Sequence, residues 1–425
     1  MKKLLTIAFV LIALTSFAQQ TYLHCGKLID VEKGKVLTEM TVVVEGDRIV
    51  TVTKGYSVAG SNDETIDLKN KTVMPGLMDM HVHIESQYDK GRYARVFKNN
   101  PADIAFRSTV FAKKTLMAGF TSVRDLGGTG VNISLRNAIK SGAVDGPRVF
   151  TAGKAIATTG GHGDPTNGYR ADLMGNPGPK EGVINSPAEA RQAVRQRYKN
   201  GTDVIKITAT GGVLSVAKDG SGPQFTMDEL KAVVETANEY GMLTSAHAHG
   251  PEGMKRAVEA GITTIEHGTL MTEEVMDLMK EKGTYLVPTI TAGKFVAEKA
   301  AIEGFYPVVI VPKALMIGPK IQETFGKAYK RGVNIVFGTD AGVFPHGENG
   351  KEFGYMVEAG MPAMEAIQSA TMTPAKLLKV DNELGSITKG KYADIIAVDE
   401  DPTKNIKTME NVRFVMKGGV VYKNE

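Results

Sequence analysis

Side chains that can bind a metal ion or move a proton recur along the chain, each at or near the end of a short apolar run. They are His81, His83, Lys206, His247, His267 and Asp340. The only cysteine, Cys25, excludes both an intramolecular disulfide and a cysteine-built zinc site. A metal ion in this chain would therefore need ligands from histidine, aspartate, glutamate or a modified lysine.

His81 and His83 flank one valine at the end of a β-like run. Alternate residues of a strand point to the same side, so we expect both imidazoles to face the interior together. Two neighbouring neutral imidazoles suit zinc or a similar cation. An isolated pair of this kind more often lies on the surface, and the further histidines and the aspartate at other strand ends are what favour a metal site.

Lys206 lies inside the apolar run from Asp203 to Thr208, where a bare ammonium group is costly to desolvate. Two interpretations remain open at this point. The side chain reaches solvent or pairs with Asp203, or its amine reacts with carbon dioxide. The resulting carbamate is an anionic ligand that can bridge two cations.

Three residues are candidates for catalysis and substrate binding. Asp340 can bind a metal and accept a proton from water, and its alternative role is to cap a following helix. His162, in a glycine-rich loop, can polarise a carbonyl, although a loop histidine is more often solvated. His249 shares a face with His247 but lies at the strand exit, so we assign it to the substrate.

The elements that must position these residues alternate between strands and helices. Eight strand-like runs are predicted, at 72–83, 121–127, 148–153, 203–208, 243–248, 264–268, 285–290 and 334–340. Helices are predicted between them, among others at 101–118, 187–199, 226–240 and 251–260. This alternation predicts an α/β fold, a (β/α)8 TIM barrel over residues 74–379, in which the carboxyl ends of the strands form one mouth.

Both ends of the remaining chain show short alternating runs broken by glycine, which are typical of antiparallel strands. We expect residues 19–73 and 380–425 to combine into one small β-sandwich domain. The charged stretch 313–331 is expected to be a solvated helix face, the alternative being a cover over the mouth.

Residues 1–18 have the features of a secretory signal peptide, with two basic residues, an apolar run and small residues before Ala18. We expect cleavage near Ala18 and a secreted or periplasmic protein with no membrane span after cleavage, a retained anchor being the alternative. With 51 basic and 47 acidic residues the net charge is +4, and nothing indicates a nucleic-acid-binding surface.

The combination of HVH after a strand, a strand lysine, two later strand histidines and the final GTDAG resembles the amidohydrolase superfamily of metal-dependent hydrolases. The segments MPGLMDMHVH, KITATGG, SAHAHG, AGITTIEHGT and GTDAG are similar to the imidazolonepropionase-related branch, which contains exported Xaa-Pro and Xaa-Arg/Lys dipeptidases. The resemblance covers nearly the whole chain after the signal peptide.

The resemblance implies two divalent ions, with zinc expected. His81, His83 and Asp340 would hold one ion and His247 and His267 the other. A carbamate on Lys206 would bridge the two ions opposite a hydroxide. His162 would contact the scissile carbonyl, and His249 and Arg170 are candidates for binding the substrate, including its free carboxylate.

These features predict a binuclear metal-dependent amidohydrolase that cleaves the C–N bond of small peptides, with Xaa-Pro or Xaa-Arg/Lys dipeptides as expected substrates. The hydroxide would attack the carbonyl while Asp340 moves its proton to the leaving nitrogen. A cyclic amide hydrolase of the imidazolonepropionase type is the alternative, and a non-catalytic binding protein is a third reading. The expected partners are small molecules or dipeptides, and the sequence is compatible with a homo-oligomer.

Overall fold

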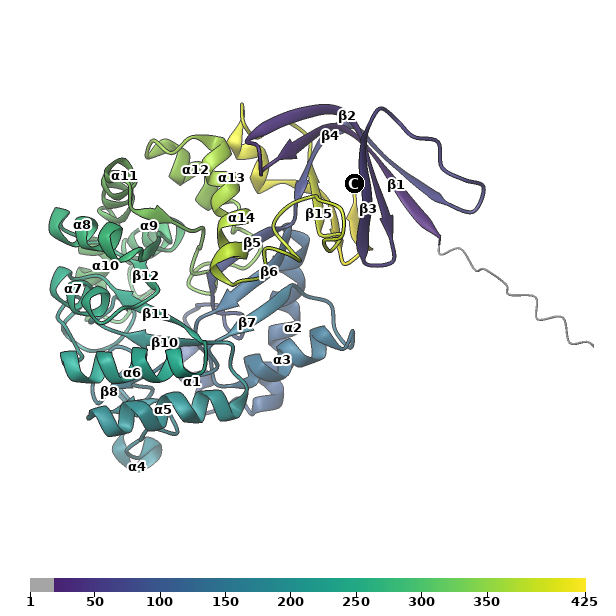
Figure 1. The fold of residues 1–425 in the computed structure, drawn as a ribbon. Helices are drawn as coiled ribbons and strands as arrows, with labels where there is room; N and C mark the ends of the chain where they lie inside the picture. Colours follow the sequence, from purple (N-terminus) through teal and green to yellow (C-terminus); the bar gives the residue numbers. More distant parts are fainter. Residues whose placement is uncertain (1–18) are drawn as a thin grey trace, which may run out of the picture.

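The computed structural model describes residues 19–425 (Figure 1). The predicted signal peptide, residues 1–18, lies outside the described residues. No helix in the described part of the chain combines the length and the apolar character needed to cross a bilayer.

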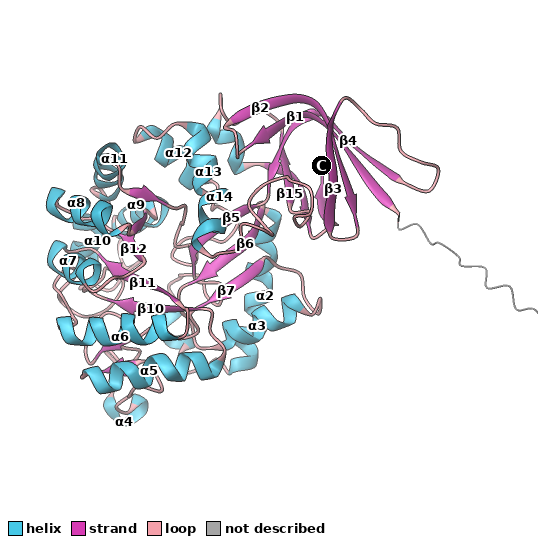
Figure 2. Cartoon of the chain, viewed as in Figure 1, coloured by secondary structure: helices cyan, strands magenta, loops and turns pink. Residues whose placement is uncertain are grey.

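Eight parallel strands carry the middle of the chain (Figure 2). Three form one sheet: β5 (Leu77–Val82), β6 (Phe120–Asp125) and β7 (Arg148–Thr151). Five form a second sheet: β10 (Val204–Thr208), β11 (Leu243–Ala248), β12 (Thr264–His267), β13 (Tyr285–Val287) and β14 (Asn334–Ile335). Each lies inside or within one residue of a predicted run, which confirms the α/β class with parallel sheets.

Backbone hydrogen bonds join these two sheets at both edges. At one edge, the segment that follows β7 runs along β10, and the Ile156 amide donates to the Lys206 carbonyl oxygen over 2.8 Å. On the other side, the segment that follows β14 runs along β5, and the Asp340 amide donates to the His81 carbonyl over 2.7 Å. The hydrogen bonding therefore passes from β5 through β14 and returns to β5.

Helices lie outside these strands (Figure 1). They are α1 (Arg92–Arg95), α2 (Pro101–Met117), α3 (Val131–Lys140), α4 (Ala171–Met174), α5 (Pro187–Asn200), α6 (Met227–Glu239), α7 (Pro251–Glu259), α8 (Glu273–Lys282), α9 (Ile290–Ala300), α10 (Val311–Ile317), α11 (Ile321–Arg331), α12 (Lys351–Glu358), α13 (Ala363–Ser369) and α14 (Met372–Leu377). Their starts follow local chemistry. At α6, for example, Thr226 and Glu229 exchange side-chain and backbone hydrogen bonds as a capping box.

The predicted run 72–83 is divided in the structure. Its first part belongs to β4 (Glu64–Pro75), in the sheet of the chain ends, and its second part is β5. Gly76 lies between them, and a Cβ there would be 2.3 Å from the Thr121 hydroxyl oxygen. The close approach of Thr121 therefore requires glycine where the chain passes from one sheet to the other.

The two chain ends form one sheet of seven strands in the order β17-β16-β15-β4-β1-β2-β3. Besides β4, its members are β1 (Gln20–Asp30), β2 (Lys35–Glu45), β3 (Arg48–Lys54), β15 (Ile395–Val398), β16 (Val412–Lys417) and β17 (Val420–Asn424). A 3-10 helix, Ile406–Glu410, precedes β16, and a short parallel pair, β8 (Ala157–Thr158) and β9 (Val183–Ile184), forms its own two-stranded sheet.

This sheet combines both chain ends as predicted, but the two layers of a β-sandwich are not shown. The reason is that β4 pairs with both β1 and β15, so the strands of the two ends continue one hydrogen-bonded ladder. One face of the sheet has its own apolar cluster, which includes Leu23, Cys25 and Phe414, each 0% exposed. The division at residues 73 and 380 stays a prediction.

Candidate active site

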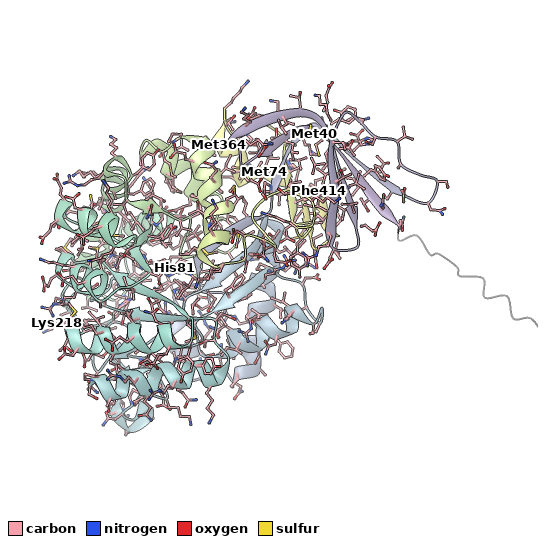
Figure 3. The ribbon with its side chains drawn as sticks, viewed as in Figure 1. Met40, Met74, His81, Lys218, Met364 and Phe414 are labelled. Atoms are coloured by element: carbon pink, nitrogen blue, oxygen red, sulfur yellow. The ribbon has the colours of Figure 1, made fainter. Side chains whose placement is uncertain are left out.

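One cavity of about 680 Å³ lies at the carboxyl ends of the parallel strands. It is lined, among others, by His81, His83, His162, Lys206, His247, His249, His267 and Asp340. Eight of the nine predicted site residues therefore reach one space, although they are spread over some 260 positions of sequence. In Figure 3, His81 lies in the interior of the molecule, among the parallel strands.

The tightest group in the cavity consists of His81, His267 and Asp340. All three are buried, and one possible ligand atom from each lies within 4.8 Å of the others. Asp340 Oδ1 is 3.2 Å from His83 Nε2 and 3.5 Å from His81 Nε2, yet it has no hydrogen-bond partner among the residues that the structure describes. A buried carboxylate oxygen that faces two ring nitrogens without a hydrogen bond fits a cation placed between them.

The outer nitrogens of the predicted ligands have partners that orient the rings. His81 Nδ1 lies 2.8 Å from a Glu266 carboxylate oxygen, and His83 Nδ1 lies 2.8 Å from the Gly127 carbonyl. Both acceptors take a hydrogen from Nδ1, so Nε2 keeps its lone pair on the side of Asp340.

The histidines of the next two strands are held from different sides. His247 uses Nε2 toward the Gly211 carbonyl, at 3.1 Å, which leaves Nδ1 as its free ligand atom. His267 Nδ1 lies 2.7 Å from the Thr289 hydroxyl. The ring centroids of His247 and His267 are 4.7 Å apart, so His247 lies next to the group that already contains His267.

Burial keeps the imidazoles of His81, His247 and His267 neutral, whereas, although burial opposes it, the charge of Asp340 raises the pKa of His83. Burial lowers the pKa of His81 to about 4 and lowers the pKa values of His247 and His267 well below the usual range. A neutral imidazole is the form that binds a metal ion. The donor set, and the neutral state of His81, His247 and His267, therefore fit divalent metal ions.

Lys206 is 4% exposed, so it does not reach solvent. Asp203, its predicted alternative partner, instead pairs with Arg136 at 2.7 Å. Burial lowers the pKa of Lys206 to about 8, against the opposing charges of Glu266 and Asp340. The structure thus contradicts both the solvated and the Asp203-paired interpretations, and leaves a buried amine in the cavity.

His162 and His249 stand beside the predicted ligands. The ring of His162 stacks on that of His247, with centroids 4.3 Å apart, and its Nδ1 has no hydrogen-bond partner among the described residues. The ring of His249 stacks on that of His267 at 5.0 Å, and its Nδ1 lies 3.0 Å from the Thr269 hydroxyl. Burial lowers the pKa of His162 to about 3, so this loop histidine is a neutral ring at the cavity wall.

Arg170 is the one predicted site residue that the structure does not bring to the cavity. Its side chain is 74% exposed and pairs with Asp172 at the start of α4. The neighbouring Tyr169 lines the cavity instead. The local sequence indicated that Arg170 lies near the opening of the cavity, but it did not determine the path of this irregular loop or the direction of the side chain.

Sequence reasoning missed a buried network behind the ligands. Glu266 accepts hydrogen bonds from Arg124, at 2.9 Å, and from Ser245, at 2.7 Å, besides its contact with His81. Asp79 accepts from the His81 amide and the Thr339 hydroxyl. A signal was available, because charged residues stand inside otherwise apolar strands in TSVRD and TIEHG.

Three residues of the site adopt backbone angles that are unusual for side chains other than glycine. The φ values are 72° at His267, 52° at Thr289 and 60° at Asp340. Such conformations cost of order 1–3 kcal/mol each and persist where surrounding contacts hold them. Here they aim the ends of three strand segments at the same point.

Comparison with known proteins agrees with this geometry. Residues 72–422 match the amidohydrolase family. The ochratoxinase of Aspergillus niger is 32% identical over 443 aligned residues, which cover 97% of this chain and 89% of that protein. A solved structure of a Xaa-Pro dipeptidase with methionine bound in its active site is 54% identical, with a TM-score of 0.93 over 96% of this chain and 100% of that one.

A prolidase solved with N-methylphosphonate-L-proline is 34% identical, with a TM-score of 0.87 over 96% of this chain and 100% of that one. The family match covers most of the sequence, and these relatives extend over nearly its whole length. The chain therefore belongs to the amidohydrolase family and is a hydrolase that acts on carbon–nitrogen bonds.

Proposed function

We propose that the protein is a dipeptidase that binds two divalent metal ions, with zinc expected, and hydrolyses Xaa-Pro dipeptides. The observation that carries this proposal is the unpartnered Asp340 oxygen facing the Nε2 atoms of His81 and His83 inside the cavity. The choice of substrate is supported by the similarity to a Xaa-Pro dipeptidase and a prolidase.

The residues would share the two ions as follows. His81, His83 and Asp340 would hold the first, and His247 and His267 would hold the second. When bound, such ions supply a hydroxide nucleophile at neutral pH and polarise the scissile carbonyl.

A carbamate on Lys206 would bridge the pair. Because its pKa is lowered to about 8, part of the amine is neutral near neutral pH and can attack carbon dioxide. The ammonium first loses one proton to solvent and becomes the neutral amine. The amine then forms a C–N bond with carbon dioxide and releases a second proton, so that a cationic side chain becomes an anion. That change of sign removes a buried positive charge from a site that must bind cations.

Asp340 is the proton carrier. Although burial opposes it, the neighbouring His81 and His83 hold the pKa of Asp340 below its usual range, so the carboxylate is ionised and able to accept a proton. It would pass this proton to the leaving nitrogen. Neutral His162 would donate a hydrogen bond to the carbonyl oxygen, and His249 would orient the substrate.

We also propose the finer features of the chain. The cyclic hydrogen bonding supports a closed (β/α)8 barrel, with residues 19–73 and 380–425 as the accessory β domain. The features of residues 1–18 support export to the periplasm or the medium.

A dipeptide panel with metal analysis tests the function. The chain from Gln19 is purified, loaded with zinc and assayed against Xaa-Pro and Xaa-Arg/Lys dipeptides and against cyclic amides such as an imidazolone. We expect about two zinc ions per chain, as in two-metal hydrolases, and turnover of Xaa-Pro substrates. Hydrolysis of cyclic amides without any dipeptide turnover would contradict the proposal.

A further inference from the structure

The loop from Gly211 to Gln224, between β10 and α6, touches two residues of the site. It has neither helix nor strand over most of its length, and its ends are closed by a hydrogen bond from the Gly211 amide to the Gly222 carbonyl, at 2.9 Å. The Gly211 carbonyl accepts from His247, and the Gln224 side chain accepts from the His162 amide at 2.7 Å.

Gly212 gives the loop a closer contact with His162. A Cβ at this position would lie 2.2 Å from the imidazole, so the bare backbone packs directly against the ring. Any displacement of Gly212 therefore changes the space that holds His162.

The same loop forms an apolar wall of the cavity. Val213, Leu214 and Val216 line it together with Val296 from α9 and Ile317 from α10. Val213 also belongs to a small apolar cluster that includes Val296 and Ile317. A polar substrate side chain that packs here would lose its hydrogen bonds to water, whereas an apolar side chain has none to lose.

One distant side chain holds this loop in place. Lys313, on α10, is 6% exposed, and its Nζ donates to the carbonyls of Gly212, Ser215 and Ala217 at 3.1, 2.6 and 2.7 Å. All three acceptors are main-chain carbonyls of the irregular loop, and the Gly212 carbonyl also accepts from the Ser215 hydroxyl over a longer 3.4 Å. An ammonium group has three hydrogens, so all of them are used on this loop.

We propose that Lys313 is a positioning residue of the active site. By holding loop 211–224 in place, it positions the apolar cavity wall that receives a substrate side chain. It also keeps the Gly212 backbone packed against the His162 ring. This inference rests on the proposed dipeptidase function and narrows its substrates to dipeptides with an apolar residue before proline.

Selectivity between Met-Pro and Gly-Pro tests the wall. In Lys313→Met, which keeps the length but has no donor, we expect the ratio of kcat/KM values for the two substrates to fall about tenfold, the scale for a lost apolar contact in a pocket. We expect kcat on Gly-Pro to fall as well, because His162 loses its backing, while the zinc content stays unchanged. Lys313→Arg, which keeps charge and donors, should recover part of the ratio.

Lys320→Met is the matched control, since Lys320 is exposed a few residues further along. It should leave both substrates unaffected. An unchanged ratio in folded Lys313→Met would overturn the proposal. If that variant does not fold, Leu214→Ala carries the same test, and an unchanged ratio there would overturn the wall.

A second measurement needs no activity. Lys218 is exposed on this loop, and Figure 3 shows it at the outer edge of the molecule, so trypsin can cut after it. We expect the fragment ending at Lys218 to appear about tenfold faster in Lys313→Met than in the wild type, because local opening becomes easier. Equal cleavage rates would refute the role of Lys313 in holding loop 211–224, even if no dipeptide were hydrolysed. Faster cleavage without dipeptide turnover would refute only the proposed function.

Discussion

At the carboxyl ends of β5, β10, β11 and β12 the chain buries imidazoles, a carboxylate network and an amine, whereas the apolar cluster of the seven-stranded sheet consists of aliphatic, aromatic and sulfur-containing side chains. Each buried apolar side chain of the sheet contributes about 1.5–3 kcal/mol to folding. The polar groups of the site cost free energy unless they are paired, and Asp340 Oδ1 has no hydrogen-bond partner within residues 19–425. The difference indicates that the site is built for ligands and the sheet for stability.

The sharpest test of this contrast is Lys206→Met. The change replaces a buried amine with an apolar side chain of similar length, so we expect the fold to persist, the zinc content to fall and turnover to become undetectable. Metal analysis and the dipeptide assay on the same sample measure both effects. A variant that still holds two ions at full occupancy would remove the bridging role.

Asp340→Asn should separate chemistry from folding. The amide keeps the shape of the carboxylate but cannot accept the proton, so we expect kcat to fall by about 10²–10⁴-fold, the usual worth of a positioned acid–base group. Circular dichroism should show an unchanged fold. Near-normal kcat would exclude Asp340 as the proton carrier.

His162→Asn should have a smaller effect. Removing one donor to a developing oxyanion lowers kcat by about 10²–10³-fold, and zinc content should not change because His162 holds no ion. Loss of zinc in this variant would show that His162 is a ligand, in conflict with the arrangement proposed above.

The sequence located the site better than it located the contacts behind it. His81, Lys206 and His267 were predictable because strand ends of a parallel fold converge, so position along a strand is enough. Glu266 and Lys313 were not, since their roles depend on partners 185 and about 100 residues away. The prediction that Arg170 binds the substrate was wrong because the local sequence does not determine the course of a long loop.

The sheet should respond in the opposite way to the site. Leu68 is 0% exposed in the apolar cluster of the sheet, so Leu68→Ala should lower the free energy of unfolding by about 2–5 kcal/mol. Because none of the described residues that line the cavity belongs to the sheet, kcat/KM below the unfolding transition should not change. Urea unfolding and the dipeptide assay give the two numbers. Val58→Ala, at a position that is 92% exposed, is the matched control and should alter neither.

The smallest effect concerns the one titratable side chain inside that cluster, Cys25. Burial raises the pKa of its thiol from 9.0 to about 12, although a backbone hydrogen bond from Val42 opposes the shift. In the unfolded chain the thiol ionises near its ordinary pKa, so this group leaves stability unchanged below pH 9 and lowers it as pH rises from 9 to about 12. Between pH 8 and pH 10 the wild type should therefore lose about 1.4 kcal/mol of unfolding free energy that Cys25→Ala does not lose.

The thiol should also resist Ellman's reagent at pH 8 until urea unfolds the chain. Rapid reaction of the native protein would mean that the sheet admits solvent, and that the contrast between an ordered apolar sheet and a polar, reactive site is weaker than the structure indicates.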